Sequence, residues 1–85
     1  MSFFVYIIYS ESKDKYYVGY TANIEERLEK HNLGATPSTR HGIPWELVYS
    51  EEFPTKKLAI TRENQIKKKK SRSYIEYLVS KNQPD

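Results

Sequence analysis

Residues 4–31 read FVYIIYSESKDKYYVGYTANIEERLEKH, and this stretch decides the fold. Residues 3–9 are apolar or aromatic on both alternating faces and rich in β-branched side chains, which predicts a buried strand at the centre of a sheet. The polar residues 10–15 form a turn, and residues 16–21 form a second, antiparallel strand. Asn23 then caps a helix that runs to about residue 32, with Glu26 three positions after the cap.

The remaining chain supplies one more strand and two more helices. Residues 33–44 form a loop, in which Gly34 suits the left-handed position after a helix. Residues 45–53 form a third strand, with Trp45, Leu47 and Tyr49 expected on one face. Pro54 and Thr55 begin the second helix. The expected inner stripe of that helix is Leu58, Ala59, Arg62 and Ile66.

A last helix follows the basic run, with either Ser71 or Ser73 as its cap. Glu76, three positions after Ser73, favours Ser73. The predicted fold is therefore an α+β domain in the order β-β-α-β-α-α, with a three-stranded antiparallel sheet flanked by helices. Residues 1–80 form one domain and residues 81–85 a frayed tail.

The composition limits where the protein works. The chain has 85 residues, enough for one small domain, and no cysteine, which excludes disulfides and thiolate metal sites. The lack of cysteine favours a reducing compartment, so we expect a cytoplasmic protein. The apolar run of residues 3–8 is too short to span a membrane, and no basic segment precedes it as in a signal peptide. A monomer is the default expectation.

Charge is distributed unevenly along the chain. Residues 1–55 carry a net −3 and residues 56–85 a net +6, which together give the formal net charge of +3. A concentration of basic residues at one end is typical of a face that binds a polyanion such as nucleic acid. A solvated, lysine-rich helix surface explains the same pattern, and charge alone favours it.

Within residues 4–31, several polar residues lie beside apolar faces of the predicted elements, where freely solvated side chains are not expected. On the first helix, Arg27 and His31 are neighbours at i and i+4 and flank its apolar seam. Tyr17 and Gly19 share a face of the second strand, and a glycine there suggests close approach of a phosphate or backbone, or a bulge. Taken singly, Arg27 could pair with a glutamate, His31 could be a satisfied helix-end histidine, and the tyrosines could pack across strands.

Two further groups carry open alternatives. Glu63 lies at the edge of the inner stripe of the second helix, where a carboxylate either pairs with Lys67 or holds a cation, and the sequence favours the pair. Residues 33–44 form a long loop that either contacts phosphates or simply connects elements. The candidate nucleic-acid-binding residues are Thr39, Arg40, Lys67, Lys68, Lys69, Lys70 and Arg72.

The ordered set of motifs resembles one known family. The matching features are Phe4-Val5-Tyr6, Tyr17-Val18-Gly19, Arg27, His31, the segment Pro44-Trp45-Glu46-Leu47-Val48-Tyr49, and Arg62-Glu63 followed by Ile66-Lys67. Their order and spacing over about residues 4–78 are similar to those of the GIY-YIG nuclease family. Phe4 replaces the first glycine of the name motif, and Tyr20 stands where some relatives carry lysine.

The resemblance implies a divalent-metal-dependent endonuclease that hydrolyses phosphodiester bonds in DNA. Structure-specific cleavage in repair or recombination is one form of that activity. The resemblance also implies catalytic roles for Tyr6, Tyr17, Arg27, His31 and Glu63, with Glu63 holding one Mg²⁺ or Mn²⁺ and Gly19 structural at the site. The general base is Tyr17 or His31, since histidine titrates near neutrality whereas tyrosine needs a lowered pKa. The main alternative is a nucleic-acid-binding module that does not cut, and a weaker one is a protein that pairs through exposed tyrosines.

Overall fold

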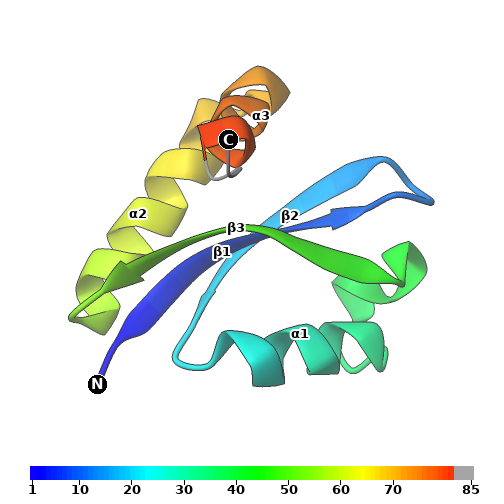
Figure 1. Ribbon diagram of the computed structural model, residues 1–85, viewed down its shortest axis with the longest axis horizontal. Coiled ribbons are helices and arrows are strands. Elements are labelled where there is room, and N and C mark those ends of the chain that lie inside the picture. Colours follow the sequence, from blue (N-terminus) through cyan, green and yellow to red (C-terminus); the bar gives the residue numbers. More distant parts are fainter. Residues whose placement is uncertain (82–85) are drawn as a thin grey trace.

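The protein is described by a computed structural model, in which residues 1–81 are placed (Figure 1). The elements are β1 (Phe3–Ser10), β2 (Lys15–Thr21), α1 (Ile24–Asn32), the short 3₁₀ helix η1 (Pro37–Gly42), β3 (Trp45–Phe53), α2 (Lys56–Lys69) and α3 (Arg72–Lys81). This order confirms the predicted β-β-α-β-α-α arrangement and adds η1 within the predicted loop. Lys81 belongs to α3, and the rest of the predicted tail, residues 82–85, lies outside the described residues.

The sheet is antiparallel in the order β2-β1-β3, so β1 is central as predicted. Between β1 and β3 the register shifts by one residue, because Ile7 lies opposite Tyr49 whereas Ile8 lies opposite Leu47. This leaves Val48 as an extra residue in β3, which reverses the alternation of faces along the strand. The prediction that Trp45, Leu47 and Tyr49 share one face is therefore wrong for Tyr49.

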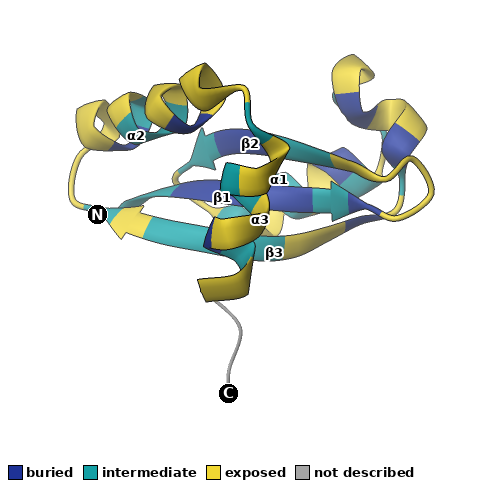
Figure 2. Cartoon of the chain, turned by 90° about the horizontal axis from the view of Figure 1, so that it is seen from above, coloured by how far each residue is buried: buried dark blue, intermediate teal, exposed yellow. Residues whose placement is uncertain are grey.

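Helices cover the two faces of the sheet differently: α2 and α3 lie on one face and α1 on the other (Figure 1). Because side chains alternate along β1, its residues divide between the two layers. Val5 and Ile7 pack with residues of α2 and α3, while Tyr6 and Ile8 pack on the α1 side. Figure 2 shows the result, with β1 mostly buried and the outer helix faces exposed.

Side-chain caps begin each α-helix. The side chain of Asn23 accepts a hydrogen bond from the backbone N–H of Glu26 at 3.1 Å, as the sequence indicates. The hydroxyl of Thr55 caps α2 in the same way. For α3 the cap is Ser71, whose Oγ accepts from the backbone N–H of Tyr74 at 3.2 Å. The preference for Ser73 is therefore wrong, since Ser73 lies inside the first turn of the helix.

The buried stripe of α2 is narrower than predicted. Ala59 and Ile66 are buried, whereas Leu58 is 47% exposed. At about 100° per residue, Leu58 projects about 100° away from Ala59 and so falls off the stripe. Gly34, in contrast, has a φ of 78° and occupies the predicted left-handed position after α1.

Candidate active site

Tyr6 and Gly19 form the centre of the site. They lie opposite each other in the β1–β2 pairing, whose register has no shift, so no bulge explains the glycine. A Cβ atom at Gly19 would lie 2.6 Å from Oη of Tyr6. The group that approaches Gly19 is therefore the Tyr6 phenol, which reaches over the edge strand β2.

A chain of hydrogen bonds runs inward from the Tyr6 hydroxyl. Its oxygen lies 2.9 Å from Nε2 of His31, and Nδ1 of His31 lies 2.8 Å from Oγ1 of Thr39. The Thr39 hydroxyl donates its proton to the backbone carbonyl of Thr36 at 3.2 Å. Oγ1 must therefore accept from Nδ1–H, which leaves Nε2 to accept the Tyr6 proton. Burial and the charge of Arg27, which lower the pKa of His31, favour this neutral form of the imidazole.

Arg27 closes this network on its outer side. Its Nε donates to Oη of Tyr6 at 3.4 Å, so its partner is a phenol and not the glutamate considered from the sequence. That hydrogen bond is the main cause that raises the pKa of Arg27, to which the nearby Tyr17 phenol also contributes. Burial, and then repulsion by Arg27, lower the pKa of His31. Burial is likewise the main cause that raises the pKa of Tyr6.

Tyr17 stands beside this network and is the more open of the two phenols. Its ring centroid lies 6.4 Å from that of Tyr6 and 5.1 Å from that of His31, the latter edge-on. Tyr6 is only 2% exposed, whereas Tyr17 is of intermediate exposure. Tyr17 also lines a cavity of about 470 Å³ at the β2 edge, which the interior hydroxyl of Tyr6 does not.

Glu63 approaches from the other layer. It lies on α2, across the sheet from α1, and its Oε2 accepts from Nζ of Lys67 at 2.9 Å, which confirms the predicted pair. Its side chain is only 12% exposed. The carboxylate charge is one of the smaller causes that raise the pKa of Tyr6. The carboxylate therefore lies within electrostatic range of the phenol, although the two helices cover opposite faces.

The single carboxylate of Glu63 fits a hard cation, such as Mg²⁺, whose other ligands come mainly from the substrate. Among residues 1–81 no group of three or more His, Cys, Asp or Glu side chains could enclose a metal ion. Magnesium is commonly held by one or two carboxylates together with phosphate oxygens and water. The ion pair with Lys67 uses one oxygen of Glu63, so the carboxylate could bind such a cation by its other oxygen or by displacing Lys67.

The predicted nucleic-acid contacts divide into three groups. Thr39 is 1% exposed and fully engaged with His31 and Thr36, so its prediction as a phosphate contact is wrong. Arg40 is exposed, and its Nε donates to the carbonyl of Gly34. The basic residues after Ile66 lie around the end of α2. Lys67, Lys70 and Arg72 line the 470 Å³ cavity, whereas Lys68 and Lys69 line two further hollows along α2, of about 580 and 480 Å³.

Asn32 and Trp45 support the site through hydrogen bonds that no local sequence pattern predicts. The amide of Asn32 forms two hydrogen bonds with the backbone of Trp45, at 2.6 Å and 3.1 Å. The indole N–H of Trp45 donates to the carbonyl of Thr39 at 2.7 Å. These bonds tie the end of α1, η1 and the start of β3 together, and so hold Thr39 against His31. The partners are 6 to 13 residues apart, which is why sequence patterns miss them.

None of the helices among residues 1–81 is long and apolar enough to cross a membrane.

Comparisons with known proteins agree with this fold and identify its family. The family model for the GIY-YIG catalytic domain matches residues 2–76. A UPF0213 protein of Natronomonas pharaonis is 40% identical over 78 residues, which cover 91% of this chain and 89% of that protein. A UPF0213 protein of Streptococcus sanguinis is 37% identical over 68 residues, which cover 79% of this chain and 78% of that protein.

A solved structure shares the architecture. The solution NMR structure of the UPF0213 protein BH0048 from Bacillus halodurans is 35% identical and gives a TM-score of 0.60. The alignment covers 96% of this chain and 86% of that one. With a family match over almost its whole length and relatives of similar size, the chain belongs to the GIY-YIG catalytic domain family as a small, single-domain member.

Proposed function

We propose that the protein is a divalent-metal-dependent endonuclease that hydrolyses phosphodiester bonds in DNA. The observation that carries the proposal is the bonded network of Arg27, Tyr6 and His31, with Glu63 in electrostatic range of the same phenol. Cross-strand packing would explain any one tyrosine. It does not explain a guanidinium, a phenol and an imidazole that are linked one to the next by hydrogen bonds. Phosphodiester hydrolysis needs such groups, to activate water and to stabilise charge on the phosphate.

Arg27 and Glu63 supply the charge. The Arg27 guanidinium is only partly buried, so its fork can bind the non-bridging oxygens of a phosphate from the open side of the network. Glu63 would hold Mg²⁺ or Mn²⁺, which when bound offsets the negative charge that develops on the phosphate and the leaving oxygen.

His31 acts through Tyr6 and does not touch the water. Its side chain is 0% exposed, and both ring nitrogens are engaged, by Tyr6 and by Thr39. In the hydrolytic step the attacking water gives a proton to Oη of Tyr6, while the Tyr6 proton passes to Nε2 of His31. The hydroxide oxygen bonds to phosphorus, and the leaving oxygen takes a proton from solvent. Arg27 stabilises phenolate character on Tyr6 as its proton leaves, and its charge, which lowers the pKa of His31, favours the later loss of the proton from the imidazole.

Tyr17 is the more open phenol, and in this arrangement it contacts the bound phosphate. Its position beside Arg27 supports that role. The base considered from the sequence, either Tyr17 or His31, is thereby replaced by a Tyr6–His31 pair.

The test is DNA cleavage by the unaltered protein and by Glu63→Gln, with branched, flapped and nicked substrates in Mg²⁺. We expect cutting by the unaltered protein that stops with EDTA and falls to background in Glu63→Gln. Glu52→Gln is the matched control, because Glu52 is an exposed carboxylate on β3. The proposal fails if the unaltered protein cuts none of these substrates, or if Glu63→Gln cuts as fast as the unaltered protein.

A second candidate, a nucleic-acid-binding module that does not cut, is favoured by the basic end of α2. Its lysines surround an open cavity and so could bind phosphates without chemistry. The logarithm of the binding constant would then fall, for each tenfold increase in salt, by about 0.7 to 0.9 per phosphate contact. Salt-dependent binding without cleavage in the same assays would favour this candidate.

A further inference from the structure

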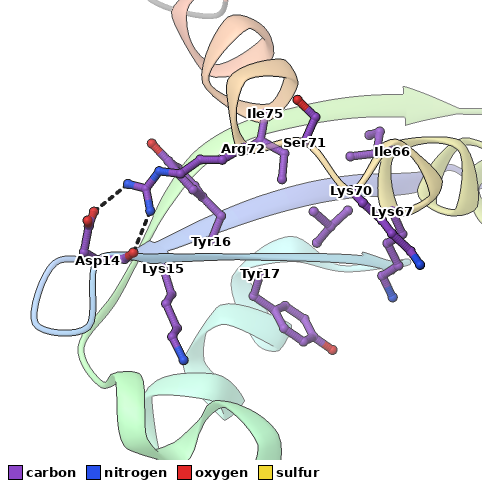
Figure 3. A pocket seen from close by; sticks show the side chains of 11 residues that line it. Asp14, Lys15, Tyr16, Tyr17, Ile66, Lys67, Lys70, Ser71, Arg72 and Ile75 are labelled. Carbon is purple, nitrogen blue, oxygen red and sulfur yellow. Dashed lines mark hydrogen bonds and ion pairs between the residues drawn. The ribbon is translucent and has the colours of Figure 1, made fainter.

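A basic cavity lies at the corner between the open edge of β2 and the joint of α2 and α3, across β2 from the network of Tyr6 and His31. It holds about 470 Å³, within the range of small-molecule pockets (Figure 3). Its apolar walls are Tyr16, Val18, Ile66 and Ile75. An apolar floor that includes an aromatic ring suits a planar, weakly polar group such as a nucleobase.

The rim of the cavity is cationic. Four basic residues, Lys15, Lys67, Lys70 and Arg72, line it against one acidic residue, Asp14, which pairs with Arg72. Arg72 donates to Oδ1 of Asp14 at 2.6 Å and to its backbone carbonyl at 2.8 Å (Figure 3). A rim of this charge attracts the phosphates on either side of a bound base.

Arg72 also fixes one end of the cavity. Its two bonds to Asp14 join residues 58 positions apart, and its guanidinium carbon lies 5.2 Å from the centre of the Tyr16 ring. The start of α3 is therefore tied to the β1–β2 hairpin before any ligand binds. A cavity that is already formed loses less conformational entropy on binding.

Tyr17 connects the cavity with the catalytic network. It lines the cavity, and its ring lies against His31 on the other side of β2. Lys67 makes a second connection, because it lines the cavity and pairs with Glu63. The cavity and the catalytic network therefore meet at the edge of β2, on opposite faces of that strand.

We propose that this cavity binds an unpaired nucleotide next to the scissile phosphate, so that the preferred substrates carry a single-stranded arm. The inference rests on the proposed function and names its substrate class. A base inside a duplex is stacked and paired, and it cannot enter a cavity without being extruded at a cost of a few kcal/mol. A base in a single-stranded arm enters without that cost.

The experiment measures binding by fluorescence anisotropy in EDTA, which prevents cleavage. Three DNAs are compared: a blunt duplex, the duplex with a thymidine arm, and the same arm made of abasic nucleotides. We expect the thymidine arm to bind more tightly than the blunt end. The abasic arm keeps the phosphates, and we expect it to bind about 5- to 150-fold more weakly than the thymidine arm, the range for loss of one stacked base.

A pair of lysine variants locates the arm. Lys70→Gln removes a rim charge, and it should lower the salt slope for the armed DNA by about 0.7. Lys57→Gln is the matched control, because Lys57 is an exposed lysine of the same helix outside the cavity lining, and it should leave the slope unchanged. Circular dichroism should show that both variants are as folded as the unaltered protein.

Equal binding of the armed and blunt DNAs would overturn the inference, as would equal binding of the thymidine and abasic arms or equal slopes for the two variants. The two proposals fail separately. Base-dependent binding of the arm without cleavage in Mg²⁺ would support the cavity and contradict the nuclease. Cleavage without any preference for the arm would support the nuclease and contradict the proposed role of the cavity.

Discussion

The two faces of β1 differ in what they bury. Ile7 points toward α2 and α3 and packs with Ala59 and Ile66 in an apolar cluster. Its neighbour Tyr6 points toward α1 and is equally buried, but it leads into the polar chain of His31 and Thr39. The strand β1 therefore contributes side chains to both the apolar core and the candidate site.

The comparison separates stability from chemistry. Burying apolar area contributes about 25 cal/mol per Å², whereas a buried hydrogen bond has a small net effect because it replaces bonds to water. The face of α2 and α3 thus supplies most of the stability, and the α1 face holds polar groups that packing alone does not require. On the face covered by α2 and α3, side-chain hydrogen bonds form among partly buried residues. There Tyr49 and Arg62 both bond Glu51, and burial and Glu51 raise the pKa of Tyr49 to about 12.

The largest effect on stability should come from the apolar face. Ile7→Ala should lower the free energy of unfolding by about 2 to 5 kcal/mol, because it leaves a cavity in a small core. Urea denaturation measures this loss. Leu58→Ala, in an exposed residue of α2, should change stability by no more than about 0.5 kcal/mol. If the two variants were equally stable, the apolar face would not be the main source of stability.

The largest effect on activity at little cost in stability should come from the polar face. Arg27→Ala should reduce the rate of DNA cleavage by about 10²- to 10³-fold, the usual loss when one stabilising donor is removed from a transition state. Its unfolding midpoint should stay close to that of the unaltered protein, since Arg27 is only partly buried. Lys30→Ala on the same helix is the control for charge. A fall in activity that merely tracks unfolding would contradict a catalytic role.

The smallest effect is a dependence of stability on pH. Because the pKa of His31 is lowered in the folded protein, the unfolded chain binds more protons below pH of about 6.5, its ordinary pKa. The contribution is fully present above that value and is lost as the pH falls from there through the lowered folded pKa. Thermal unfolding between pH 8 and 5 measures it. His31→Gln should reduce the change in unfolding temperature between pH 8 and 5. His41→Gln, at an exposed position, is the control and should not. Parallel curves for both variants would show that His31 does not titrate differently in the two states.

Local pattern was enough to predict the element order, the central place of β1 and the Asn23 cap. These features depend on alternation and on residues a few positions apart. The extra residue Val48 could not be predicted, since only the pairing with β1 shows it. Thr39 was misread for the same reason: a threonine in a polar loop looks exposed until His31 and Trp45 are placed around it.

The site residues divide in a similar way. The i,i+4 spacing put Arg27 and His31 on the buried side of α1, and the structure places them there. The sequence left the base open between Tyr17 and His31, because a choice depends on which atoms are free. The contacts of both His31 nitrogens support the proposed Tyr6–His31 pair, and no pattern along the chain contains them.

The central claim is that Glu63, from one face, and Arg27 and Tyr17, from the other, act on one phosphate at the β2 edge. NMR of the ¹⁵N-labelled protein with Mn²⁺ and a DNA strand that resists cleavage tests it most directly, because Mn²⁺ broadens the signals of nearby nuclei. The account predicts broadening of Glu63 together with Gly19, Tyr17 and Arg27, little change at Tyr49, and no broadening in Glu63→Gln. Broadening confined to α2, without Gly19 and Arg27, would contradict it.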